Sequence, residues 1–208
     1  MAYSTINKGS SYFNTVLYTG NGSTQSITGV NFKPDFVWVK ERSQIQDHAL
    51  FDSVRGATKQ LSSNTTGAEA TYANSLSAFN SNGFTVVSDA VVNSSGQTYV
   101  AWQWQAGQGT TSSNTSGSIT STVSVNTTAG FSIVTYTGTG AAATVGHGLG
   151  VAPKMIILRN RAGASWPVYH ASVGNTGAVF LNLTNTTITS STYFNNTSPT
   201  SSVFSVES

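Results

Sequence analysis

Few side chains in this sequence could carry acid–base or metal chemistry. The chain has 208 residues, of which three are histidine and none is cysteine. The lack of cysteine excludes a thiolate metal site, a cysteine nucleophile and a disulfide framework. His48 follows Asp47 and lies four residues before Asp52, so an alternating strand would place His48 and Asp52 on one face. This group could act as an acid–base pair or bind a metal, but a surface His–Asp pair in a loop is the commoner arrangement.

Glycoside hydrolysis normally needs two carboxylates about 5–10 Å apart. Residues 118–208 contain a single carboxylate side chain, Glu207, and the preceding part could offer a pair such as Asp47 with Asp52. His147 lies between two glycines, where a flexible turn would hold a ligand poorly. The sequence has no Gly-x-Ser-x-Gly and no His-Glu-x-x-His motif. We therefore predict no enzymatic activity, no catalytic residue, no metal site and no cofactor, with a polysaccharide-degrading enzyme as an alternative.

A binding site is the other chemistry that the sequence could support. Trp166 lies between a short flexible stretch and a proline, with Arg161, Tyr169 and His170 close by in the sequence. A loop tryptophan beside a guanidinium group could stack on a sugar ring. We predict these four residues as a binding site, although a tryptophan that packs at the end of a β-sandwich is the more frequent arrangement.

The elements that must position these residues occur twice in the chain. Residues 13–22 return as residues 131–140, and residues 29–42 return as residues 148–161. In the longer match a glycine, a proline and two basic residues recur at the same spacing around an apolar block. Self-similarity of this kind indicates a repeated structural unit. The sequence therefore predicts an internal duplication.

The duplication predicts two domains of about 100 residues each. We assign residues 1–107 to the first and residues 118–208 to the second. Residues 108–117 between them contain only small or polar side chains, which predicts a flexible linker. His170 occupies the position in the second copy that Asp52 occupies in the first, which argues against a catalytic role shared by both copies.

The local pattern predicts strands almost everywhere. β-Branched and aromatic residues run four to eight at a time between clusters of glycine, asparagine, serine and proline. Residues 3–6 are a candidate opening strand, and residues 65–79 are the one place where a short helix could form. We predict an all-β fold of two tandem, duplicated β-sandwich domains of the jelly-roll type.

The second copy ends before the first copy does. Residues 99–105 form the predicted last strand of the first domain, and we expect Val100, Trp102 and Trp104 to face its core. The second copy stops at Ser208 without an equivalent. We therefore expect the second domain to lack its last strand and to leave unpaired backbone groups beside the gap. More residues of a longer parent chain are the expected filling, and a strand from a neighbouring subunit is the alternative.

The composition narrows the class of partner. Charged residues make up only 8% of the chain, while 38% are hydrophobic and 11% aromatic, which is enough to form a core beneath a neutral surface. The net charge of +2 lacks the dense basic stripe that nucleic-acid binding requires. No apolar run approaches the ~20 residues of a membrane span, and the N-terminus lacks a secretion signal. We predict synthesis in the cytoplasm, no nucleic-acid partner and no membrane insertion.

The repeated motifs resemble a known group of proteins. Tyr-Thr-Gly-x-Gly at 18–22, Gly-x-x-Phe-x-Pro-Asp-Phe-Val-Trp-Val-Lys at 29–40 and Leu-Phe-Asp-Ser-Val-Arg-Gly at 50–56 are similar to tandem-repeat virion proteins of tailed bacteriophages, especially those of aquatic bacteria. Residues 166–174 and 195–205 resemble the second repeat of that group. The resemblance spans nearly the whole chain and carries no catalytic residues with it.

This resemblance implies a structural protein of the virion exterior. We expect a tail-fibre or other appendage component that forms a homotrimer, binds other virion proteins and contacts a glycan on the host surface. A capsid decoration protein that clamps neighbouring shell subunits is the first alternative, and a polysaccharide-degrading enzyme is the second.

Overall fold

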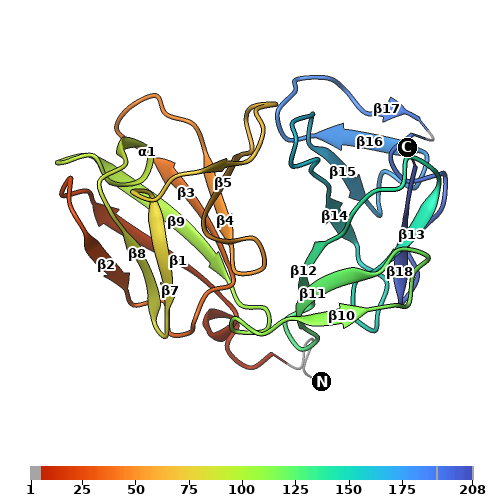
Figure 1. Cartoon of the computed structure of the whole chain (residues 1–208), viewed down its shortest axis with the longest axis horizontal. Helices are drawn as coiled ribbons and strands as arrows, with labels where there is room; N and C mark the ends of the chain where they lie inside the picture. The colour runs from red at the N-terminus through yellow and green to blue at the C-terminus, as the bar shows by residue number, and fades with distance from the viewer. Residues whose placement is uncertain (1–5, 191, 208) are drawn as a thin grey trace.

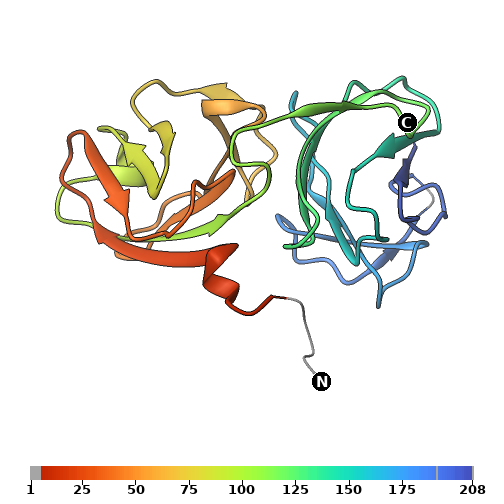
Figure 2. The same ribbon diagram turned by 90° about the horizontal axis from the view of Figure 1, so that it is seen from below.

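The computed structural model of the chain describes residues 6–190 and 192–207. This part is built almost entirely of antiparallel strands, so the predicted all-β fold is confirmed. Figure 1 shows two lobes, and Figure 2 shows the same two lobes from below. Strands β1 to β9 form the first lobe and strands β10 to β18 form the second, and no sheet of the described chain combines strands from both lobes. The boundaries of the predicted domains remain a prediction.

The first lobe contains two facing sheets, with the strand orders β1-β9-β3-β4-β5-β6 and β2-β8-β7. Its strands are β1 (Phe13–Thr19), β2 (Gln25–Thr28), β3 (Phe36–Glu41), β4 (Ala49–Asp52), β5 (Gly56–Ser62), β6 (Ala70–Thr71), β7 (Leu76–Asn80), β8 (Gly83–Val86) and β9 (Thr98–Trp104). The short 3₁₀-helix η1 (Gly9–Ser11) precedes β1, and the helix α1 (Ala90–Asn93) precedes β9. One continuous apolar core lies between the sheets, with Phe51, Phe84 and Tyr99 fully buried in it.

Strand β9 lies between β1 and β3 in the larger sheet and contradicts one prediction. Tyr99, Ala101 and Gln103 are fully buried and face the opposing sheet, whereas Trp102 and Trp104 lie on the other face. The outer face is also covered by aromatic side chains, so both faces of this strand are apolar. Alternation along the chain therefore could not identify the inner face, and the prediction that the tryptophans face the core was wrong.

The second lobe contains three small sheets, with the orders β10-β11-β12, β13-β18 and β14-β15-β16-β17. Its strands are β10 (Ser112–Asn114), β11 (Ser121–Asn126), β12 (Phe131–Thr135), β13 (Ala143–Gly146), β14 (Met155–Ile157), β15 (Pro167–His170), β16 (Gly177–Phe180), β17 (Ile188–Thr189) and β18 (Val203–Val206). Its core is divided into two apolar clusters, one around Val145 and Phe204 and one around Tyr169 and Phe194.

Several contacts of the first lobe recur in the second at the positions matched by sequence. Strand β2 pairs with β8, with Ile27 opposite Phe84, and β13 pairs with β18, with Val145 opposite Phe204. The ring of Tyr18 meets Phe84 edge-on, with centroids 6.2 Å apart and an interplanar angle of 75°. The Tyr136–Phe204 pair has the same centroid distance of 6.2 Å and an angle of 70°. The matched sequence positions therefore adopt the same local packing.

Three local predictions need correction or fall outside the structure. Residues 65–79 contain the strand β6 and the start of β7 rather than a helix, because serine, threonine and asparagine interrupt the alanine-rich pattern. Residues 108–117, predicted as a flexible linker, include β10, which pairs with β11. The predicted opening strand at 3–6 lies, apart from Ile6, outside the described residues. Neither helix of the described chain has the length and apolar character needed to span a membrane.

Candidate functional site

Trp166, the centre of the predicted binding site, is buried between the two lobes. Only 4% of its surface is exposed, and it packs with Leu50 and Leu61 of the first lobe. The indole Nε1–H donates to the carbonyl oxygens of Ser62 and Thr65 at 3.0 and 3.1 Å. The guanidinium group of Arg159 covers the ring at 4.8 Å from its centroid. This arrangement leaves no open ring face for a sugar, so the structure gives Trp166 a packing role in place of the predicted stacking role.

Arg161 takes part in the same junction. Its Nε and NH2 atoms donate to the two carboxylate oxygens of Glu69 at 2.9 and 2.7 Å. Arg55 approaches the same carboxylate at 3.0 Å and also pairs with Asp52. Burial alone would raise the pKa of Glu69, but hydrogen bonds from Arg161 and Arg55 outweigh burial and lower it. Arg161 therefore joins the lobes electrostatically and is not free to bind an anion.

The other two predicted binding residues lie elsewhere. Tyr169 is 5% exposed and packs edge-on against Phe194, with ring centroids 5.6 Å apart. His170 is exposed, and its Nδ1 accepts a hydrogen bond from the Ser172 backbone N–H at 3.2 Å. The structure therefore brings Arg161 and Trp166 together at the junction but does not assemble the four residues into one open site.

The candidate acid–base residues are also separated. His48 Nδ1 accepts a hydrogen bond from Trp38 Nε1 at 2.8 Å, and burial, followed by the charge of Lys40, lowers the pKa of His48. Asp52 forms a buried ion pair with Arg55 instead of facing His48. Asp47 accepts from Asn64 Nδ2 at 2.7 Å. The described residues contain no group of three or more His, Cys, Asp or Glu that could hold a metal.

His147 does not lie in an open turn as predicted. It is 2% exposed, its Nδ1 accepts from the Leu149 N–H at 3.1 Å, and its Nε2 lies 3.2 Å from the Thr200 carbonyl oxygen. This arrangement requires the tautomer with a proton on Nε2. Burial lowers the pKa of His147 despite the opposing effect of the Thr200 hydrogen bond. The residue therefore fastens the loop after β13 to the segment before β18.

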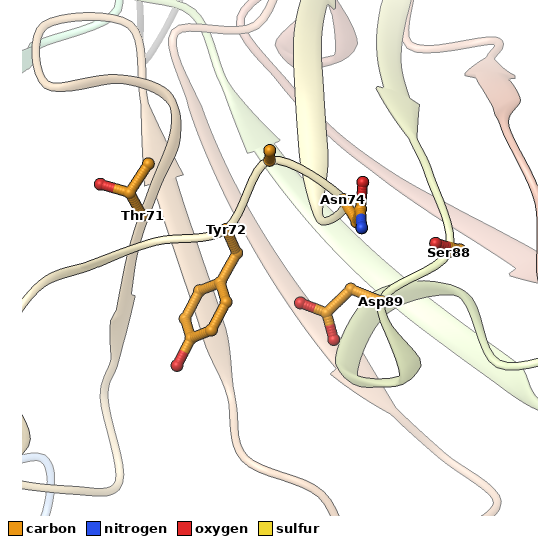
Figure 3. A pocket seen from close by; sticks show the side chains of 6 residues that line it. Thr71, Tyr72, Asn74, Ser88 and Asp89 are labelled. Carbon is orange, nitrogen blue, oxygen red and sulfur yellow. The ribbon is translucent and has the colours of Figure 1, made fainter.

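An open polar site lies on the first lobe, around Tyr72 (Figure 3). A hollow of about 370 Å³ is lined by Thr71, Tyr72, Ala73, Asn74, Ser88 and Asp89. Tyr72 is 46% exposed, and Figure 3 shows the carboxylate of Asp89 on the same side as its ring. A second hollow of about 300 Å³ shares Tyr72 and Asp89 and extends to Asp47 and Thr65. Together they form a polar groove, which we call the Tyr72 groove.

Backbone hydrogen bonds fix the walls of the Tyr72 groove. The Tyr72 N–H donates to the Thr58 carbonyl oxygen at 2.9 Å. The Asn74 carbonyl oxygen accepts from the N–H groups of Ser88 and Asp89, both at 2.9 Å. Asp89 caps α1 by accepting from Val91 N–H through Oδ1, and Oδ2 has no protein donor within the described residues. An aromatic face, a carboxylate oxygen and an amide are thus held together at one surface, and this combination suits a ligand with many hydroxyl groups.

Sequence reasoning missed this groove. Tyr72 and Asp89 lie 17 residues apart, and the only local signal is an aromatic residue among small polar ones at 71–74. Tyr72 and Asp89 line the same groove because the Asn74 carbonyl oxygen accepts hydrogen bonds from the N–H groups of Ser88 and Asp89. The sequence pattern did not indicate this pairing.

The comparisons with known proteins place the chain in a family. Residues 8–208 match a family described as a domain of unknown function, DUF7483. No curated protein and no solved structure matches the chain. Since the match covers nearly the whole chain, the protein belongs to the DUF7483 family.

Proposed function

We propose that this protein is a structural and adhesive component of a bacteriophage virion, displayed on the particle exterior as part of a tail fibre or similar appendage. The virion assignment rests on the resemblance of the repeated motifs to phage virion proteins. The adhesive role rests on one observation, the Tyr72 groove, and its ligand is a glycan of the host surface. The protein is made in the host cytoplasm, contacts other virion proteins and assembles as a homotrimer.

The chemistry of the Tyr72 groove supports a glycan ligand. An exposed tyrosine ring can cover the C–H face of a sugar, because it is large, apolar and rigid. Asp89 Oδ2 and the Asn74 side chain can bind the sugar hydroxyls. The groove is shallow and mostly polar, unlike the enclosed apolar pockets that take small cofactors. A segment of a surface polysaccharide fits such a groove better than a buried small molecule does.

The experiment for the adhesive role measures binding of the purified protein to polysaccharide from the host surface. We expect Tyr72→Ala to weaken binding at least tenfold, because the stacking surface is removed. Tyr72→Phe keeps the ring and should bind within about threefold of the unchanged protein. His170→Ala, an exposed residue of the second lobe, is the control and should leave affinity unchanged. Equal affinity of Tyr72→Ala and the unchanged protein would refute the groove as the glycan site.

The location on the virion needs a separate experiment. Antibody labelling of intact particles in electron micrographs distinguishes a tail appendage from a capsid decoration protein. Label on the tail supports the proposal, and label over the whole head favours the decoration alternative.

The enzyme alternative has one observation in its favour. Asp47 and Asp89 both line the second of the two adjoining hollows, so two carboxylates face one groove. Asp52 cannot take part, because it is paired with Arg55. Release of reducing ends from host polysaccharide that disappears in Asp47→Asn would favour a hydrolase over an adhesin.

A further inference from the structure

We propose that the second lobe has a docking site for one extended, uncharged strand with the side-chain pattern of β9, inserted between β12 and β14. We call this position the strand gap and define it by the free edges of Phe131–Thr135 and Met155–Ile157. The donated strand carries the side-chain pattern of β9. This inference concerns the second lobe and does not depend on the proposed glycan site of the first.

The first lobe shows how the equivalent position is filled. Strand β9 lies between β1 and β3 and is antiparallel to both. Trp102 is opposite Thr15 on one side and opposite Trp38 on the other. Strands β1 and β3 therefore run in the same direction, about 9.5 Å apart, at twice the usual spacing between paired strands.

In the second lobe the flanking strands are present, and no strand among the described residues lies between them. By the sequence match, β12 corresponds to β1 and β14 corresponds to β3. Strand β12 pairs only with β11, and β14 pairs only with β15, within the described chain. Each is therefore an edge strand with a row of unpaired backbone groups, which is the template that β-strand addition uses.

The direction of the free backbone groups on β14 follows from its pairing with β15. Leu158 N–H donates to the Pro167 carbonyl oxygen, and Ala171 N–H donates to the Lys154 carbonyl oxygen. In an antiparallel ladder the residues with bonds to one neighbour alternate with residues that point away from it. Met155 and Ile157 therefore direct their N–H and C=O groups into the strand gap.

Burial at matched positions shows that the second lobe lacks the cover of a strand. Val37 and Val39 on β3 are fully buried, whereas the matched Ile156 and Leu158 are only half-buried. On the outer face, Trp104 and Trp102 of β9 lie 5.3 and 6.2 Å from the rings of Phe36 and Trp38. The matched Met155 and Ile157 have no such cover and are 52% and 40% exposed.

The lack of a covering strand also accounts for the division of the core of the second lobe into two clusters. In the first lobe Tyr99 and Ala101 belong to a single apolar cluster, and Tyr99 stacks on Tyr18 with ring centroids 5.0 Å apart. In the second lobe the two clusters meet only through half-buried side chains, Ile156 and Leu158 among them. An inserted strand would join the two clusters into one core.

These features specify the occupant. It is an uncharged strand of about seven residues, the length of β9, antiparallel to both neighbours. One face presents an aromatic residue to Tyr136 followed by a small residue, as Tyr99 and Ala101 do in the first lobe. The other face carries large apolar residues over Met155 and Ile157. Neither β12 nor β14 contains a charged residue, which matches an uncharged donor.

A peptide with the sequence of residues 97–105 tests the inference with the full chain. We expect the labelled peptide to bind with one-to-one stoichiometry by fluorescence anisotropy and to raise the thermal midpoint of the protein. In the peptide, Ala101→Asp should abolish binding, because it places a charge on the face toward the core.

Two variants of one residue locate the site. Ile157→Pro removes an N–H that points into the strand gap and leaves the hydrogen bonds to β15 in place. Ile157→Thr retains the N–H and serves as the matched control. We expect at least tenfold weaker peptide binding for Ile157→Pro and no more than about threefold weaker binding for Ile157→Thr, with circular dichroism confirming that both variants fold.

Three results would overturn the inference. The first is the absence of peptide binding to the unchanged protein, and the second is equal binding by Ile157→Pro. The third is an oligomer of the protein alone that Ile157→Pro converts to monomers, since the strand gap would then hold part of a second copy and not a separate strand with the pattern of β9.

Discussion

The two lobes share several local pairings, but they differ at one strand: β9 lies between β1 and β3 in the first lobe, and no strand among the described residues lies between the matched β12 and β14 in the second. With β9 present, Val37 and Val39 are fully buried and the core is a single cluster. Without an equivalent strand, Ile156 and Leu158 are half-buried and the core is divided. The difference indicates that β9 accounts for the full burial of the inner face of its neighbour β3.

A second difference between the lobes lies at the start of β3 and β14. Asp35 is fully buried and accepts hydrogen bonds from the N–H groups of Ala106, Gln108 and Gly109 at 2.6 to 2.7 Å. These donors belong to the chain that leaves β9. The matched residue in the second lobe is Lys154, which is exposed. The Asp35 carboxylate therefore anchors the segment that follows β9, and the second lobe has no carboxylate at the matched position.

The largest expected contrast comes from a charge placed on the inner face of β3 or β14. Val37→Asp puts a carboxylate in a closed core, and its desolvation should exceed the ~5–15 kcal/mol stability of a typical domain. Ile156→Asp places the charge beside the strand gap, where water can reach it, so the second lobe should still fold. Urea unfolding followed by circular dichroism measures both. An equal loss of structure in the two variants would mean that the strand gap is closed.

The next contrast compares Asp35 with Lys154. Asp35→Asn replaces an acceptor of several N–H groups with a side chain that also carries donors, and we expect a loss of about 3 kcal/mol in the free energy of unfolding. Lys154→Ala should change it by no more than about 0.5 kcal/mol, as exposed positions usually do. Denaturant midpoints provide the measurement. A large loss in Lys154→Ala would reveal an anchoring role that its exposure does not suggest.

The stability of the contact between the lobes should depend on pH, because Glu69 titrates there. Because the folded-state pKa of Glu69 is lowered, its stabilising effect is present above the ordinary value of 4.5 and is lost as the pH falls through the folded pKa. Glu69→Gln should therefore lower the thermal midpoint at pH 7 and have little effect in strong acid. Calorimetry at several pH values measures this difference. A difference that stays constant from pH 7 to strong acid would exclude the ionised carboxylate as its source.

The smallest expected effect is at the outer face of β14. Ile157→Thr should change stability by no more than about 0.5 kcal/mol in the protein alone, because the side chain is already 40% exposed. When the peptide of residues 97–105 is bound, the same substitution should cost more, since the peptide would cover the side chain. Thermal midpoints with and without peptide test this. An identical cost under both conditions would place the peptide elsewhere.

The strand pattern and the repeated motifs predicted much of the fold. They predicted the all-β class, which is confirmed, while the lack of a second counterpart of residues 99–105 stays a prediction. They did not predict which face of β9 is inner, because Tyr99 and Trp102 lie on opposite faces that are both covered. Alternation shows that two faces differ, but it does not show what each one packs against.

The candidate site was less predictable for a related reason. Trp166 was recognised as unusual, yet its surroundings come from Leu50, Leu61 and Ser62, which lie more than 100 residues away in the chain. Such a contact between lobes leaves no local signal. The Tyr72 groove depends in the same way on the pairing of Asn74 with Ser88 and Asp89. Residue types indicated candidates, and contacts distant in sequence decided their roles.

Amide hydrogen exchange, resolved to single residues by NMR, tests the strand gap most directly. We predict that the amides of Met155 and Ile157 exchange rapidly in the protein alone, while those of the matched Phe36 and Trp38, which face β9, exchange slowly. Addition of the peptide of residues 97–105 should slow the first pair without changing the second. Slow exchange of Met155 and Ile157 in the protein alone, at the level of Phe36 and Trp38, would contradict an open strand gap.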